Sequence, residues 1–253
     1  MIGKVAQIWR HPIKSHGREA LDEVWLEAGR TMPGDRVWAV AHDAAKLDRA
    51  APAWAACVNF SRGAKAPALM AINAVYDAED GRVTLSHPRR PTLSFDPDDP
   101  ADAARFLAWV APLSPADRAA PAGLYRVEGR GMTDTDYPSI SLLNLASHRA
   151  VEGRVGRPLS PQRWRGNFVL DGLPPWEEFE WPGRRLRLGE AEIEVRERIT
   201  RCLATAASTR TGERDADTLG ALEAGFGHRD FGVYAVVVQS GAVRIGDAVE
   251  PVP

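Results

Sequence analysis

Cysteine is scarce in this sequence, and its scarcity excludes several kinds of site. The 253 residues contain two cysteines, Cys57 and Cys202. Two cysteines cannot hold an iron–sulfur cluster or a Cys-rich zinc site alone, and they allow at most one disulfide. A disulfide framework is therefore excluded, and the expected location is a reducing, cytoplasmic compartment.

Long hydrophobic runs and a large net charge are also missing. No apolar segment approaches the length of a membrane-spanning helix, and residues 1–5 lack the apolar core of a signal peptide. Lys and Arg number 32 and Asp and Glu number 34, which gives a formal charge of −2. We therefore expect no membrane partner and no nucleic-acid partner.

Several common catalytic and nucleotide-binding motifs are absent as well. The sequence contains no GxxxxGK[ST] or GxGxxG loop, no Gly-x-Ser-x-Gly elbow and no His-x-x-x-His pair. These absences argue against a phosphate loop at a helix start, a serine hydrolase and a histidine zinc site.

The sequence does contain many short apolar runs, which predict a β-rich α+β architecture resembling a β-barrel. Asp99-Pro100 predicts the start of a helix over residues 100–110. Ser147 is the expected N-cap of a second helix, and Asp215 of a third. Prolines concentrate in residues 111–123, so we expect a linker there between an N-terminal domain, 1–110, and a C-terminal domain, 124–253.

Cys202 is the first candidate for chemistry. It follows Arg201, and a nearby cation favours a thiolate, which can be a nucleophile, a sulfur carrier or a ligand to a soft metal. The alternative is a buried cysteine that acts as a small hydrophobic residue. Cys57 is expected to be structural, and a Cys57–Cys202 disulfide stays open.

Cations in turns are the second set of candidates. Arg165 and Asn167 share a face if their segment is extended, and a guanidinium beside an amide suits a phosphate or the polar edge of a heterocycle. The alternative for each cation is a solvated surface position. The other turn residues in this set are Lys14, Ser15, Arg36 and Arg49.

Seven motifs occur in an order that resembles a known family. They are His-Pro-Ile-Lys-Ser at 11–15, Gly-Asp-Arg-Val-Trp at 34–38, Asn-Leu-Ala-Ser at 144–147, Arg-Trp-Arg-Gly-Asn at 163–167, Pro-Trp-Glu-Glu-Phe-Glu-Trp at 175–181, Arg201-Cys202 followed by Thr211-Gly212, and Phe-Gly-Val-Tyr at 231–234. This series resembles MOSC proteins, named after the C-terminal domain of molybdenum cofactor sulfurase. The family includes the mitochondrial amidoxime-reducing component and bacterial relatives that reduce N-hydroxylated compounds.

The resemblance implies a fold and a set of roles. The expected fold is a MOSC-type β-barrel with a smaller N-terminal β-barrel-like domain and a few helices. Cys202 would ligate molybdenum of the molybdenum cofactor, a molybdopterin. Lys14, Ser15, Arg36 and Arg165 would hold the pterin and its phosphate, Asn144, Asn167 and Tyr234 would contact heterocycle edges, and Arg49 and Arg201 are further candidates.

The activity implied by the resemblance is two-electron reduction of small N-hydroxylated or N-oxide substrates. Electrons would come from a separate donor protein or reductant, because the sequence has too few cysteines for a cluster. A length of 253 residues leaves no room for a pyridoxal-phosphate desulfurase domain, so pyridoxal phosphate enters only as a family association.

Two alternatives remain open. The protein could be a non-catalytic carrier of sulfur or of the molybdenum cofactor, with a persulfide on Cys202. It could also be a barrel that has lost its cofactor. His16 and Gly166 support that alternative, because the family often has cysteine and proline at these positions.

Overall fold

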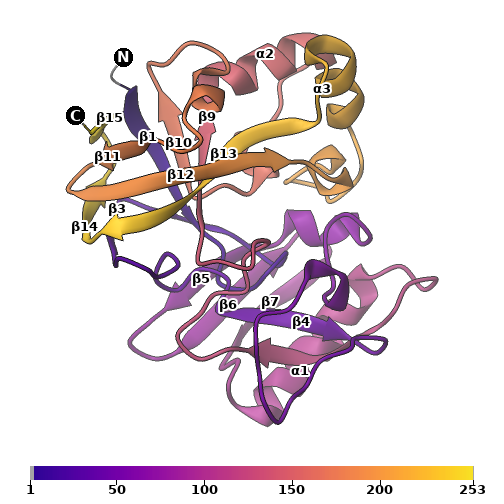
Figure 1. The fold of residues 1–253 in the computed structure, drawn as a ribbon. Coiled ribbons are helices and arrows are strands. Elements are labelled where there is room, and N and C mark those ends of the chain that lie inside the picture. Colours follow the sequence, from indigo (N-terminus) through magenta and orange to yellow (C-terminus); the bar gives the residue numbers. More distant parts are fainter. Residues whose placement is uncertain (1–2, 253) are drawn as a thin grey trace.

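The molecule consists of two lobes, and both ends of the chain lie on the same lobe (Figure 1). The computed structural model describes residues 3–252. The outermost ends of the two expected domains, residues 1–2 and 253, lie outside the described residues. No helix within residues 3–252 is long and apolar enough to cross a bilayer.

One lobe is a closed barrel of seven strands. Strand β1 closes it, because β1 pairs with β10 along one edge and with β15 along the other. The pairing of β9 with β10 is parallel, and the other barrel pairs are antiparallel. In order around the barrel the strands are β10 (Phe168–Asp171), β9 (Ile140–Asn144), β13 (Asp230–Gln239), β12 (Ala191–Thr200), β11 (Arg185–Leu188), β15 (Ala248–Pro251) and β1 (Gly3–Arg10), and β2 (Glu19–Leu21) pairs with β1 beyond it.

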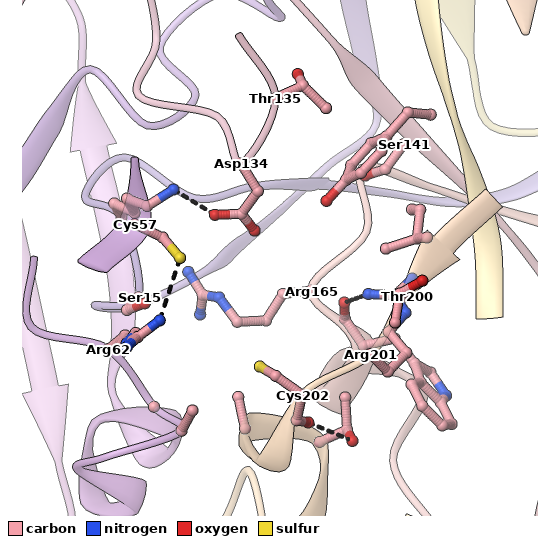
Figure 2. A pocket seen from close by; sticks show the side chains of 18 of the residues that line it. Ser15, Cys57, Arg62, Asp134, Thr135, Ser141, Arg165, Thr200, Arg201 and Cys202 are labelled. Carbon is pink, nitrogen blue, oxygen red and sulfur yellow. Dashed lines mark hydrogen bonds and ion pairs between the residues drawn. The ribbon is translucent and has the colours of Figure 1, made fainter. Parts of the chain in front are cut away.

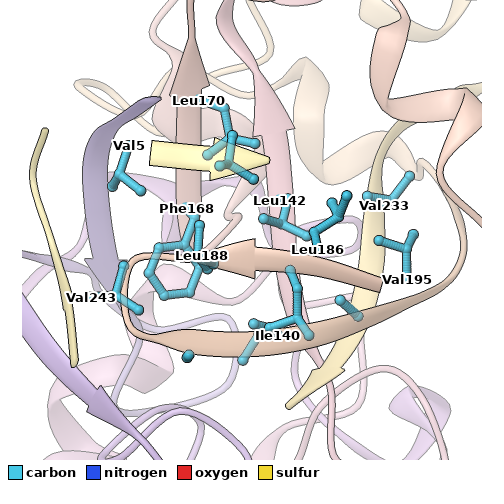
Figure 3. Packing of buried hydrophobic residues seen from close by; sticks show 14 of the residues in the cluster. Val5, Ile140, Leu142, Phe168, Leu170, Leu186, Leu188, Val195, Val233 and Val243 are labelled. Atoms are coloured by element: carbon cyan, nitrogen blue, oxygen red, sulfur yellow. The ribbon is translucent and has the colours of Figure 1, made fainter. Parts of the chain in front are cut away.

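Apolar side chains fill the barrel interior. The alternating sequence of β11 exposes its arginines and buries Leu186 and Leu188, as the period of a strand requires. Val5, Phe168 and Val233 converge with these leucines in one cluster (Figure 3). A small barrel packed in this way has no room for a ligand, so a binding site must lie outside it.

Strands from the start of the chain belong to this lobe. β1 lies within the barrel, and β3 (Glu23–Leu26) pairs with β14 (Gly241–Arg244). The two lobes therefore do not divide at a single point in the sequence. The division into 1–110 and 124–253 stays a prediction, and the expected linker 111–123 runs into the start of β8 at Pro121.

The other lobe contains two small sheets and one α-helix. β4 pairs with β8, and β6 lies between β5 and β7. Helix α1 begins as predicted, because the Asp99 side chain accepts a hydrogen bond from the backbone NH of Asp102 and Pro100 follows the cap. The elements are β4 (Trp38–His42), η1 (Cys57–Asn59), η2 (Pro67–Ala71), β5 (Asn73–Asp77), β6 (Arg82–His87), β7 (Arg90–Phe95), α1 (Pro100–Val110), η3 (Ala111–Leu113) and β8 (Pro121–Arg126).

Two further α-helices pack on the barrel lobe, and both expected N-caps were wrong. Asn144 caps α2 (Leu145–Val155) in place of Ser147, whose hydroxyl donates to the buried carboxylate of Glu178. Asp217 caps α3 (Thr218–Phe226) in place of Asp215. Three short 3-10 helices complete this lobe: η4 (Pro161–Trp164), η5 (Glu177–Glu180) and η6 (Leu203–Ala206). The β-rich α+β fold class is thus confirmed.

Gly232 in β13 provides a test of this packing. Its φ is +76°, and a Cβ there would lie 2.5 Å from the carbonyl oxygen of Leu142 in the neighbouring strand. We expect Gly232→Ala to lower the free energy of unfolding by about 2–4 kcal/mol, measured by urea denaturation, because strain and a backbone clash add. Gly227→Ala is the matched control, since Gly227 has a φ of +78° but no heavy atom within 4 Å of the added Cβ. Equal losses in both variants would contradict the clash.

Candidate functional site

A cavity of about 580 Å³ lies between the two lobes (Figure 2). Its size is within the range of cofactor and small-molecule sites. One wall comes from β12, β13 and the segments around Arg165 and Cys202, and the other from residues of the N-terminal half such as Trp54. Seven of the predicted site residues line it: Lys14, Ser15, Arg36, Arg165, Arg201, Cys202 and Tyr234.

Three predicted residues lie elsewhere. Arg49 is exposed, and its guanidinium donates to the carbonyl of Leu124. Asn144 is buried as the cap of α2, and Asn167 is buried where its side-chain oxygen accepts from Ser141. Both asparagines therefore satisfy neighbouring backbone and side-chain groups instead of facing the cavity.

Arg165 has the most unusual environment in the cavity. It ends η4 with a left-handed backbone, and both terminal guanidinium nitrogens are buried with no hydrogen-bond partner among the described residues. Burial, assisted by the charge of Arg36, lowers the pKa of Arg165 to about 9. An unpartnered buried cation is costly, and an anion that reached the two nitrogens would relieve that cost.

The position of Arg165 is set by its neighbours. A Cβ on Gly166 would lie 2.4 Å from the Leu143 side chain, so the chain passes directly beside β9 at this point. Gly166 thus permits a close approach of these two segments. Ser15 and Arg36 also have positive φ, at 63° and 51°, and both line the same cavity. Strained backbone of this kind gathers at functional sites.

Lys14 and Arg36, the predicted cations of the cavity that come from the N-terminal half, already have carboxylate partners. Lys14 is buried, and its Nζ lies 2.5 Å from Asp134 and 2.9 Å from the carbonyl oxygen of Met132. Arg36 forms an ion pair with buried Asp35 and donates to the carbonyl of Arg165 at 2.9 Å. Burial opposes ionisation of Asp35, but the adjacent cations hold the pKa of Asp35 and of Asp134 below the usual range. Arg165 is therefore the predicted cation that stays free for an anion.

Arg201 supports the wall that carries Cys202. Its guanidinium donates to the carbonyls of Phe231 and Trp164, with Nε–O and Nη1–O distances of 2.7 Å. Burial lowers the pKa of Arg201 to about 10. The guanidinium is thus occupied by backbone oxygens, and it braces β13 against η4.

Cys202 itself is exposed, contrary to the alternative of a buried hydrophobic residue. It precedes η6, where its carbonyl accepts from the backbone NH and the hydroxyl of Thr205. Arg163 donates to the carbonyl of Thr205 at 2.8 Å, which ties this turn to η4. The backbone around the thiol is therefore anchored while the sulfur is open to the cavity (Figure 2).

Cys57 lies in the same cavity, which the expectation of a purely structural thiol did not include. It is half-buried, and Arg62 donates a hydrogen bond to its Sγ at 3.2 Å. Both thiols are free in the structure, so no disulfide joins Cys57 to Cys202.

Sequence reasoning missed the acidic groups of the cavity and the phenol of Tyr137. Tyr234, which was predicted, also lines the cavity, and burial with the charge of Asp134 raises its pKa, so its hydroxyl stays protonated at neutral pH and can donate a hydrogen bond. The available signal was the polar run from Thr133 to Tyr137, which combines two aspartates with a tyrosine directly before a proline. The missed lining residues include Asp134, Asp136, Tyr137 and Glu197.

The cavity combines an anion site with a soft ligand. A ligand with one anionic end could reach Arg165, and a soft metal at its other end could be bound by the Cys202 thiolate. The unpartnered guanidinium, the exposed thiol and a cavity of about 580 Å³ together fit a metal–pterin phosphate better than they fit a free metal ion.

Two family models together match nearly the whole chain. The family model described as "MOSC domain" matches residues 132–250, and the model described as "MOSC N-terminal beta barrel domain" matches residues 2–120. Two curated relatives are both called molybdenum cofactor sulfurase. The protein from Anopheles gambiae is 37% identical over 121 residues, and the one from Drosophila grimshawi is 34% identical over 112 residues.

These matches span only a small part of the relatives. They cover 43% and 44% of this chain, but 16% and 13% of the Anopheles and Drosophila proteins. Among solved structures, the YUAD protein from Bacillus subtilis has a TM-score of 0.49 and 14% identity, over 98% of this chain and 94% of that chain. YiiM from Geobacillus stearothermophilus has a TM-score of 0.36 and 23% identity, over 45% of this chain and 54% of that chain.

Proposed function

Since this chain belongs to the MOSC family, with both the MOSC domain and its N-terminal β-barrel domain, we propose that it binds the molybdenum cofactor between its two lobes. We further propose that it is an oxidoreductase that reduces N-hydroxylated or N-oxide substrates. The observation that carries this proposal is the exposed thiol of Cys202 in the same cavity as the unpartnered guanidinium of Arg165.

Each part of the cavity would have a role in holding the cofactor. Cys202 would ligate the metal, because a thiolate suits a soft metal centre. Arg165 would bind the terminal phosphate through its two free nitrogens, with the Ser15 hydroxyl as a further donor. Asp134 holds Lys14 in place, and Arg201 braces the Cys202 wall. When bound, the cofactor supplies two-electron redox chemistry at a metal.

The reaction itself needs electrons and protons from elsewhere. Reduction of R–NH–OH breaks the N–O bond, consumes two electrons and two protons, and yields R–NH₂ and water. A separate donor protein or another reductant would supply the electrons. The protein would orient the N–O group, and the protonated Tyr234 hydroxyl could donate a hydrogen bond to a substrate oxygen.

A second function is favoured by the exposure of the Cys202 thiol and by the names of the curated relatives. In this alternative the protein carries sulfur as a Cys202 persulfide, or carries the cofactor, without turnover. Bound cofactor, reductase activity and a persulfide on Cys202 are the observations that distinguish the two functions.

The first experiment is to purify the protein from a host that makes the cofactor and to measure its molybdenum and pterin content. We expect near-stoichiometric amounts of both, and reduction of an N-hydroxylated amidine with a dithionite-reduced viologen as electron source. Cofactor without reduction of either an N-hydroxylated amidine or an N-oxide would favour the carrier. Absence of both metal and pterin would contradict cofactor binding.

A further inference from the structure

We propose that Arg18, which lies outside the cavity, is a positioning residue for the site. Its side chain clamps η2 of one lobe to the segment that follows Cys202 in the other lobe, and it thereby sets the spacing of the two cavity walls. The effect on the cofactor rests on the proposed function, whereas the clamp itself is a property of the cofactor-free protein.

Arg18 holds two segments that are far apart in the sequence. It is buried in the turn between β1 and β2, three residues after Ser15 at the cavity. Nη1 donates to the carbonyl oxygens of Met70 at 2.8 Å and of Ile72 at 3.1 Å, and Nη2 donates to that of Thr209 at 2.9 Å. Met70 lies in η2 and Ile72 directly follows it, whereas Thr209 lies between η6 and α3. One guanidinium therefore joins the two lobes.

The segments that Arg18 joins also pack closely against each other. A Cβ on Gly212 would lie 2.6 Å from the Cα of Ala68, so the loop between η6 and α3 lies directly on the backbone of η2. Arg214 adds a second hydrogen bond between the lobes, to the carbonyl of Ala64 at 2.9 Å. The lobe clamp, as we define it, consists of Arg18, Gly212 and Arg214.

The lobe clamp is continuous with both walls of the cavity. On one side, Gly63 and Ala64 line the cavity shortly before η2 begins. On the other side, η6 connects the clamp to Cys202. The two sides meet where a Cβ on Gly63 would lie 3.3 Å from the Cβ of Ala204 in η6. A change in the clamp would thus move the thiol relative to the opposite wall.

Arg18 is also close to the anion end of the cavity. Burial and the charge of Arg36 contribute most to the low pKa of Arg165, and the charge of Arg18 is the next contribution. A planar guanidinium donates in fixed directions, which the point charge of a lysine does not reproduce. Three carbonyl oxygens from two segments therefore require arginine at this position.

Loss of the clamp would leave the two walls free to move. Domains of one chain move relative to each other by default unless a large interface holds them. A displacement of about 1 Å at a reacting group can lower a rate about 100-fold. Without the clamp, Cys202 and Arg165 would no longer face one ligand at a fixed distance. We therefore expect weaker cofactor retention and a lower rate per bound molybdenum.

The first test is amide hydrogen exchange of the cofactor-free full chain, measured by mass spectrometry. In Arg18→Met, we expect peptides from residues 62–72 and 203–214 to exchange more than about tenfold faster than in wild type, because hydrogen bonds to a charged group are lost. Arg18→Lys should have an intermediate effect. Arg214→Met should accelerate the same peptides less, since its exposed side chain makes only the second link.

Leu188→Ala is the control for a general loss of stability. Leu188 is buried in the barrel interior, so its truncation should accelerate exchange in the barrel strands and leave the clamp peptides unchanged. Unchanged exchange of the clamp peptides in both Arg18→Met and Arg214→Met would overturn the clamp. If Arg18→Met does not fold, Arg18→Lys and Arg214→Met decide the outcome.

The second test uses the cofactor-loaded protein. We expect Arg18→Met to lose pterin during gel filtration and to lower kcat per bound molybdenum by about tenfold or more. Leu188→Ala should retain its pterin and its kcat per bound molybdenum. Faster exchange of the clamp peptides with unchanged pterin retention and unchanged kcat per bound molybdenum would overturn the positioning role. A wild-type protein that binds no cofactor would overturn the proposed function, while the exchange rates would still decide whether the clamp exists.

Discussion

Cys202→Ala is expected to lose its molybdenum and its N-reduction activity while keeping its fold. The thiol would be the protein's bond to the metal, and even the loss of an indirect partner of a metal ligand costs 10–100-fold in affinity or activity. We therefore expect activity to fall more than about 100-fold and metal content to fall to background, measured by elemental analysis. Because the side chain is exposed, the free energy of unfolding should change by less than about 0.5 kcal/mol.

Cys57→Ala is the control for this variant. Cys57 also lines the cavity, but it comes from the N-terminal half and its sulfur accepts a hydrogen bond from Arg62. It should retain molybdenum. Metal content that survives in Cys202→Ala and falls in Cys57→Ala would exchange the two assignments. A third outcome would favour the carrier function over the reductase. In that outcome the wild type and both variants bind no metal, and a persulfide donor adds the mass of one sulfur to Cys202 of the wild type.

Arg165→Met is expected to have opposite effects on stability and on cofactor binding. The pKa of Arg165 is lowered to about 9 by burial, so the charged form is disfavoured in the folded protein. This cost is fully present below pH 9, and it is relieved only as the pH rises from about 9 towards the unfolded value. At pH 7 the cofactor-free variant should thus be more stable than wild type, by about 1–3 kcal/mol in urea denaturation.

The same substitution should remove the phosphate donor. We expect the variant to retain less than about a tenth of the pterin after gel filtration, because a charge-assisted fork contributes more than one ordinary hydrogen bond. Arg49→Met is the matched control, since Arg49 is exposed and outside the cavity. If cofactor-free Arg165→Met is less stable than the cofactor-free wild type, Arg165 has a structural partner. If Arg165→Met retains as much pterin as the wild type, the phosphate binds elsewhere.

Local sequence determined much of the fold and the individual candidates. Polar and apolar residues alternate over 185–188, and Asp99-Pro100 starts α1. Both are patterns within a few residues of sequence, and the structure confirms both. Choices between nearby alternatives were less secure. Asn144 and Ser147 can both cap a helix. Both donate to Glu178, which is buried in a distant turn, and it is the Asn144 oxygen that accepts from the NH of Ala146.

Only the tertiary structure decided which of the predicted residues are free to bind. Lys14 and Arg36 resemble Arg165 in sequence, but Asp134, which is 120 residues from Lys14, and Asp35 neutralise them, and Arg165 keeps two unpartnered nitrogens. The contacts of Asp134 with Lys14 and of Tyr137 with Glu197 likewise join residues that are 120 and 60 positions apart. The reason is physical: a charge is available or consumed according to what packs against it, and a partner such as Asp134 lies 120 residues from Lys14, where no local pattern connects the two.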